Sequence, residues 1–280
     1  MIQTISIPKK EYSIPAVLHL PDETTAPFPA VILCHGTGSD KDEVGHMFMR
    51  LADLLASQGI ASIRFDFAGC GDSQAPQQAL TFLGEVDDTM AVYQMLSQYL
   101  AIDPQRIGIL GFSQGARVMA EFLRHSSATG SHTSRHVPHG KSYPITTAVS
   151  WSGACHNGPG VFASWYPLYY EEAVQKGYAS IPLDWREDLL VSRAWFDEIW
   201  DTKPLDGFAF YPGPVLAIAG TADPIVPCQH AQEILAHCSH PESRSLILPD
   251  ADHTFCVLTE DQSRAEQVLQ ETVAWFDAHL

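Results

Sequence analysis

One stretch constrains the fold of this chain more than any other: residues 111–115, which read GFSQG. The stretch follows a short apolar run and precedes a segment with the pattern of an amphipathic helix. A serine between glycines at this spacing is typical of a nucleophile elbow, which is a very tight turn from a strand into a helix. The turn leaves no room for a β-carbon two residues before or two residues after the serine. Such a turn raises the hydroxyl of Ser113 above the sheet edge, near the first amides of the helix. The alternative is that Ser113 only caps that helix.

Strand and helix patterns alternate along most of the chain. Strands are expected at residues 3–7, 12–20, 30–33, 61–67, 106–110, 146–152, 214–220 and 244–248. Besides the helix after the elbow, helical periodicity predicts helices at 44–58, 84–100, 229–237 and from about 260 to the end. This alternation predicts an α/β fold with a mostly parallel central sheet flanked by helices. Reactive residues are expected at the carboxyl ends of its strands.

The alternation stops between residues 154 and 212. This segment is rich in aromatic residues and holds four of the six tryptophans. A simple loop of that length is unusual in a compact domain, and the aromatic side chains must be buried against something. We expect a core formed by 1–153 and 213–280 and an inserted lid at 154–212, with Trp165 and Tyr169 as candidate substrate contacts. The alternative is that these aromatic side chains form only a separate core of their own.

A serine nucleophile needs a base within hydrogen-bond reach and a carboxylate that fixes the tautomer of that base. Ser113, Asp223 and His253 each follow a predicted strand, and they occur in the order expected for an α/β-hydrolase triad. Asp250 and Asp252 are too close to His253 in sequence to orient it easily from another strand. We therefore predict Ser113, Asp223 and His253 as the catalytic residues.

Acyl transfer also needs hydrogen-bond donors for the oxyanion. The backbone N–H of Gln114, directly after the nucleophile, is one candidate. The second should come from the loop that follows residue 34, where the sequence reads HGTG, and we choose the N–H of Thr37. His35 is expected to brace this loop rather than to react.

No cofactor and no metal are expected from these patterns. The six cysteines contain no CxxC pair, which predicts free buried thiols rather than disulfides or a zinc site. A polar stretch at 126–141 contains His132, His136 and His139 and is typical of a surface loop. A three-histidine metal site is the alternative there, although neither a carboxylate nor a cysteine supports it nearby.

The formal net charge of −17 disfavours nucleic acid and anionic membranes as partners, since both would be repelled. The sequence has neither the pattern of a signal peptide nor 18 consecutive apolar residues, so we expect a cytoplasmic protein. The expected partner is a small-molecule ester. The oligomeric state stays open, with a homodimer as one option.

Five stretches together resemble the α/β-hydrolase superfamily: HGTGSDKDE (35–43), RFDFAGCGDS (64–73), GFSQG (111–115), GTADPIVP (220–227) and DADHTF (250–255). Within it, the chain resembles bacterial intracellular carboxylesterases of the cinnamoyl or feruloyl esterase kind over roughly residues 1–125 and 214–280. Those esterases carry an inserted lid between the sixth strand and the acid-bearing strand. They commonly have a bulky aromatic residue after the His-Gly pair, where this chain has Thr37.

These features predict a serine carboxylic-ester hydrolase that acts through an acyl-enzyme on small apolar or aromatic esters, with hydroxycinnamoyl esters among the candidates. Three alternatives stay open. The first is a peptidase of the prolyl-oligopeptidase type, which usually carries a large extra domain. The second is acyl transfer to an acceptor other than water, and the third is a binding protein without catalysis.

Overall fold

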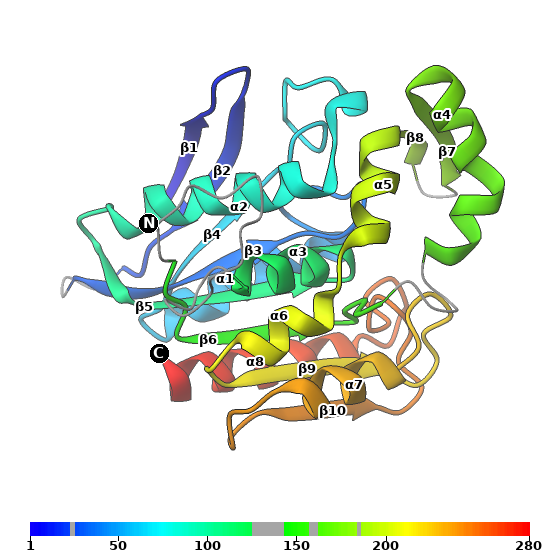
Figure 1. Cartoon of the computed structure of the whole chain (residues 1–280). Coiled ribbons are helices and arrows are strands. Elements are labelled where there is room, and N and C mark those ends of the chain that lie inside the picture. The colour runs from blue at the N-terminus through cyan, green and yellow to red at the C-terminus, as the bar shows by residue number, and fades with distance from the viewer. Residues whose placement is uncertain (23–25, 125–142, 157–161, 184–185) are drawn as a thin grey trace.

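The computed structural model describes residues 1–22, 26–124, 143–156, 162–183 and 186–280. Eight strands form a central sheet in the order β1-β2-β4-β3-β5-β6-β9-β10 (Figure 1). Their bounds are β1 Ile2–Pro8, β2 Ser13–His19, β3 Phe28–Cys34, β4 Ala61–Phe65, β5 Ile102–Phe112, β6 Thr147–Trp151, β9 Val215–Gly220 and β10 Arg244–Leu248. The pairs β1–β2 and β2–β4 are antiparallel and the other pairs are parallel. The mostly parallel sheet predicted from the sequence is confirmed.

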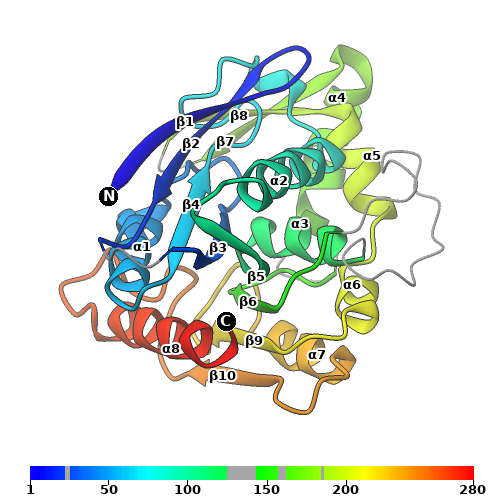
Figure 2. The same cartoon turned by 90° about the vertical axis from the view of Figure 1, so that its left-hand side faces the viewer.

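Helices cover both faces of the sheet, as Figure 2 shows. On one face lie α1 (Met47–Ser57) and α8 (Ser263–His279), and on the other α2 (Phe82–Ser97), α3 (Gln114–Leu123) and α7 (Gln229–His237). Successive residues of β3 point to opposite faces. Val31 and Leu33 therefore pack with α1 and α8, whereas Ala30 and Ile32 pack with α2 and α3. Burial on both faces explains why this strand has no polar residue.

Two helices begin at other residues than the sequence predicts. The helix expected from residue 44 begins at Met47, after a short 3₁₀ turn, η1 (Val44–His46). Gly45 and His46 have positive φ angles of 58° and 56°, which separate the turn from the helix. The helix expected from residue 84 begins at Phe82, because the side chain of Thr81 accepts the N–H of Gly84 at 2.9 Å and caps the helix.

The described part of the segment between β6 and β9 lies outside the central sheet. Its elements are η3 Phe162–Ser164, η4 Tyr166–Tyr170, α4 Glu171–Lys176, β7 Tyr178–Leu183, β8 Arg186–Ser192, α5 Arg193–Asp201 and α6 Pro204–Phe210. Strands β7 and β8 form an antiparallel pair of their own, which lies beside α4 and α5 in Figure 1. Trp195 and Phe196 are buried, and Phe162, Trp165 and Tyr166 stack edge-on or tilted around them at 5.1–5.7 Å between ring centroids. The segment thus has an aromatic core.

Several expectations concern smaller features of the chain. All six cysteines are free, as predicted, but only Cys34, Cys70 and Cys155 are buried. His132, His136 and His139 lie outside the described residues. The short 3₁₀ turn η2 (Gln77–Ala79) precedes α2. No helix among the described residues has the length and apolar character needed to cross a lipid bilayer.

Candidate active site

The turn between β5 and α3 has the geometry of a nucleophile elbow. Ser113 lies between the two elements with φ 52° and ψ −113°, a strained conformation for a residue with a side chain. A β-carbon on Gly111 would lie 2.4 Å from the carbonyl oxygen of Gly115. One on Gly115 would lie 2.1 Å from the carbonyl oxygen of Cys34 in β3. Both glycines are therefore required by close backbone approach, which is the reason inferred from their spacing.

Ser113, Asp223 and His253 form a chain of hydrogen bonds at the carboxyl ends of β5, β9 and β10. The ring of His253 lies with Nε2 3.0 Å from Ser113 Oγ and Nδ1 2.7 Å from Asp223 Oδ2. The other oxygen of Asp223, Oδ1, accepts the backbone N–H groups of Ile225 and Val226, both at 2.8 Å. An ionised Asp223 requires the proton of His253 on Nδ1, so that the lone pair on Nε2 faces the serine hydroxyl.

Asp252 stabilises the loop that carries His253. Its Oδ1 accepts the backbone N–H groups of Thr254 and Cys256 at 2.9 and 2.8 Å. On the other side of the loop, the hydroxyl of Ser152 donates to the carbonyl oxygen of His253 at 2.9 Å. The acid that contacts the imidazole ring is thus Asp223, whereas Asp252 contacts the backbone.

The loop after β3 is held by two buried side chains. His35 donates from Nδ1 to the carbonyl oxygen of Gly36 at 2.8 Å and accepts the N–H of Phe67 on Nε2 at 3.2 Å. Glu43 accepts the N–H of Gly36 at 2.7 Å and the hydroxyl of Ser39 at 2.8 Å. Sequence reasoning missed Glu43. A glutamate seven residues after a glycine gives no signal unless the loop is known to fold back on itself.

Two backbone N–H groups near the nucleophile have no hydrogen-bond partner within the described ranges. They belong to Thr37 and Gln114, the residues chosen from the sequence. The N–H of Gly36, by contrast, is occupied by Glu43. Gln114 begins α3, so its N–H is one of the first amides of that helix, which carry a partial positive charge. Their role as oxyanion donors stays a prediction.

The inserted segment contacts both loops that border the triad. Arg186 of β8 donates from Nη1 to the carbonyl oxygen of Gly38, and Leu189 packs against the same glycine. Phe162 packs against Ala154 and against Val226, three residues after the triad aspartate. Trp165 and Tyr169 are half-buried in the same segment, and no hydrogen bond or ring contact joins either one to the triad in the described part of the chain.

A buried polar pair lies behind the nucleophile. The side chain of Gln114 donates to Glu85 Oε2 on α2 at 3.1 Å, and both residues are buried. Burial raises the pKa of Glu85 to about 8. A glutamate in the first turn of an amphipathic helix is usually solvated, so the sequence gives no sign that Glu85 is buried against Gln114. This contact fixes the side chain of the residue that directly follows the nucleophile.

The raised pKa of Glu85 predicts a pH-dependent contribution to stability. The pKa lies at 4.5 in the unfolded chain and at about 8 in the folded one, so the folded state holds this proton more tightly. The contribution is complete below about pH 4.5 and is lost as the pH rises towards 8. Glu85→Gln should therefore gain free energy of unfolding relative to the wild type, by about 1 kcal/mol per pH unit between pH 5 and 8.

Urea unfolding at several pH values measures this difference, with the exposed Glu260→Gln as control. A difference that does not change with pH would contradict the prediction.

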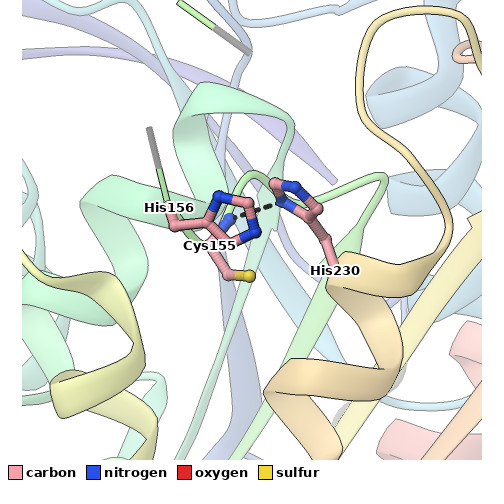
Figure 3. A group of neighbouring side chains, drawn as sticks. All are labelled: Cys155, His156 and His230. Atoms are coloured by element: carbon pink, nitrogen blue, oxygen red, sulfur yellow. Dashed lines mark hydrogen bonds between the residues drawn. The ribbon is translucent and has the colours of Figure 1, made fainter. Parts of the chain in front are cut away.

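One group of side chains in the described residues has the composition of a metal site: Cys155, His156 and His230. These residues lie after β6 and at the start of α7 (Figure 3). A serine, histidine and aspartate triad performs acyl transfer without a metal ion.

Comparison with known proteins gives a family and a fold. Residues 31–271 match the family model described as "Alpha/beta hydrolase family". Esterase FrsA of Yersinia pestis (strain Pestoides F) is 33% identical over 110 residues, which are 38% of this chain and 24% of that protein. The match thus spans about a quarter of the length of this curated relative.

Two solved structures are similar over nearly the whole chain. Est1E from Butyrivibrio proteoclasticus, with ferulic acid bound, has a TM-score of 0.73 and 18% identity, with 98% of each chain covered. The α/β hydrolase GrgF from Penicillium sp. sh18 has a TM-score of 0.77 and 12% identity over 100% of this chain and 99% of that chain. At these identities the similarity shows the fold alone. The resemblance inferred from the five motifs is confirmed, and this chain belongs to the alpha/beta hydrolase family.

Proposed function

We propose that the chain is a serine carboxylic-ester hydrolase. The hydrogen-bonded chain from Asp223 through His253 to Ser113 is the observation that carries this proposal. Ser113 Oγ attacks the ester carbonyl while His253 takes its proton, and the N–H groups of Thr37 and Gln114 stabilise the oxyanion. His253 then protonates the departing alcohol. A water molecule, deprotonated by His253, attacks the acyl-enzyme and releases the acid and Ser113.

The proposed substrates are small esters with an apolar or aromatic group, with hydroxycinnamoyl esters as the first candidates. Two observations support this class: the aromatic core of the inserted segment, and the ferulic acid bound to the structurally similar Est1E. In this proposal residues 154–212 form a lid over a core made of 1–153 and 213–280. Trp165 and Tyr169 are the proposed aromatic contacts to the substrate.

The test combines labelling with substrate comparison. A fluorophosphonate probe should react once per chain, at Ser113, because only a serine with an adjacent base is nucleophilic enough at neutral pH. The same preparation should hydrolyse p-nitrophenyl acetate and methyl ferulate. A p-nitroanilide peptide of proline serves as the peptidase substrate, and an added alcohol as the acyl acceptor. No reaction at Ser113 would overturn the mechanism. Faster cleavage of the anilide would indicate a peptidase, and preferential transfer to the alcohol an acyltransferase.

A further inference from the structure

A second cluster of reactive side chains lies beside the triad and takes no part in it. Cys155 and His156 follow β6, and His230 is the second residue of α7, so the cluster joins segments 75 residues apart. The candidate ligand atoms of the three side chains all lie within 4.8 Å of one another. Figure 3 shows the two imidazole rings and the sulfur atom converging from these two elements. The ring centroids of His156 and His230 are 4.0 Å apart.

A carboxylate lies beside the cluster. Glu233 lies on α7 one turn after His230, a spacing that places both side chains on the same face of the helix. Its Oε2 lies 3.4 Å from His156 Nε2 and 4.0 Å from Cys155 Sγ. The carboxylate thus lies against two of the three side chains of the cluster.

Two of these separations can be compared with those of a tetrahedral zinc site. Zinc bonds of about 2.3 Å to sulfur and about 2.0–2.1 Å to nitrogen or oxygen place neighbouring ligand atoms roughly 3.3–3.6 Å apart. The distance of 3.4 Å between His156 and Glu233 already falls in that range. The distance of 4.0 Å between Cys155 and Glu233 exceeds it by a few tenths of an ångström, which a side-chain rotation can supply.

The buried histidine presents a lone pair rather than a proton to the cluster. The backbone N–H of Cys155 donates to His230 Nδ1 at 3.0 Å, so Nδ1 is the unprotonated nitrogen. A metal ion would replace this N–H as the partner of Nδ1.

We propose that Cys155, His156, His230 and Glu233 form a binding site for a divalent transition metal ion, with Zn²⁺ as the best match to the donor set. Binding forms the metal–sulfur bond and releases the thiol proton of Cys155 to solvent. The ion bridges the end of β6 to α7. The buried guanidinium of Arg117 acts electrostatically on both His230 and Cys155 and opposes further positive charge here, and the carboxylate of Glu233 offsets that effect at Cys155.

The bridge would connect two segments that border the triad. The N–H of Ala154, directly before the cluster, donates to the carbonyl oxygen of Ser113 at 3.3 Å. On the other side, α7 follows the loop that carries Asp223. A bound ion is therefore expected to stabilise the folded chain, whatever reaction the triad performs.

Cobalt(II) is the probe, because it occupies zinc sites and reports its ligands by absorption. The protein is used without a histidine tag, reduced and freed of metal with a chelator. One equivalent of Co²⁺ should give a thiolate charge-transfer band in the near ultraviolet and the intense visible bands of tetrahedral cobalt. Zn²⁺ should displace Co²⁺ and raise the Tm of the protein.

Two variants test the ligands. Cys155→Ser should abolish the ultraviolet band, and His156→Ala, at a half-exposed position that folding tolerates, should weaken Co²⁺ binding at least tenfold.

Two controls make the test specific. Cys256→Ser removes a half-buried thiol outside the cluster and should leave the band unchanged. A triple variant with His132→Ala, His136→Ala and His139→Ala removes the other histidine-rich stretch and should also keep it. The proposal would be overturned if the wild type lacked the ultraviolet band, or if Cys155→Ser kept it. It would also be overturned if His156→Ala bound Co²⁺ as tightly as the wild type, or if the triple variant lost the band. None of these readouts depends on ester hydrolysis.

Discussion

Ser113→Ala should lower kcat for p-nitrophenyl acetate by about 10⁴- to 10⁶-fold with little change in KM. The substitution removes the atom that forms the acyl-enzyme, and no other hydroxyl in the hydrogen-bonded chain can replace it. The two free N–H groups and the binding surface remain, so a residual rate above that of water is expected. Steady-state kinetics over a range of ester concentrations measure both constants.

Ser57→Ala is the matched control for this variant. Ser57 is exposed at the end of α1, where its hydroxyl donates to the carbonyl oxygen of Leu54 at 2.6 Å. Its loss should leave kcat unchanged. If Ser113→Ala kept more than about one hundredth of the wild-type kcat, Ser113 would not be the nucleophile.

Asp223→Asn should lower kcat by about 10⁴-fold. Oδ1 of Asp223 accepts two backbone N–H groups, so an asparagine here must place its oxygen at that position and its NH₂ group towards His253. Nδ1 of the imidazole must then accept a hydrogen bond, which moves the ring proton to Nε2. A protonated Nε2 has no lone pair for the hydroxyl of Ser113, and the general base is lost.

Asp277→Asn gives the same chemical change at an exposed position on α8 and should leave kcat unchanged. Circular dichroism and urea unfolding establish that Asp223→Asn is folded. A folded Asp223→Asn variant with more than about a tenth of the wild-type kcat would show that this carboxylate does not fix the tautomer of His253.

The parts of the site that follow strand ends could be predicted from the sequence. Ser113, Asp223 and His253 each follow an apolar run, and parallel strands bring their carboxyl ends to one edge, so linear order was enough to group them. Burial on both faces of the sheet made these runs recognisable, as in β3. Helix starts were less accurate, since Thr81 and Gly45 act through local backbone geometry rather than periodicity.

Contacts between distant segments that do not both follow strand ends could not be predicted. Cys155 and His230 come together because the loop after β6 packs on the first turn of α7, and neither residue has a metal-ligand spacing with a sequence neighbour. The roles of Glu43 and Glu85 depend in the same way on chain reversals that bring a carboxylate to a buried N–H group or amide. Arg186 contacts Gly38 only through the packing of β8 on the loop after β3.

The close approach of Gly115 to β3 limits how this chain can change over evolution. The position tolerates no β-carbon, so any amino-acid substitution there displaces the first turn of α3 from the sheet. The inserted segment meets the neighbouring loop through the side chains of Arg186 and Leu189, which can be exchanged one at a time. The contacts of this segment can therefore change among descendants of this chain while the elbow stays the same, because the two sets of residues lie in separate stretches of the sequence.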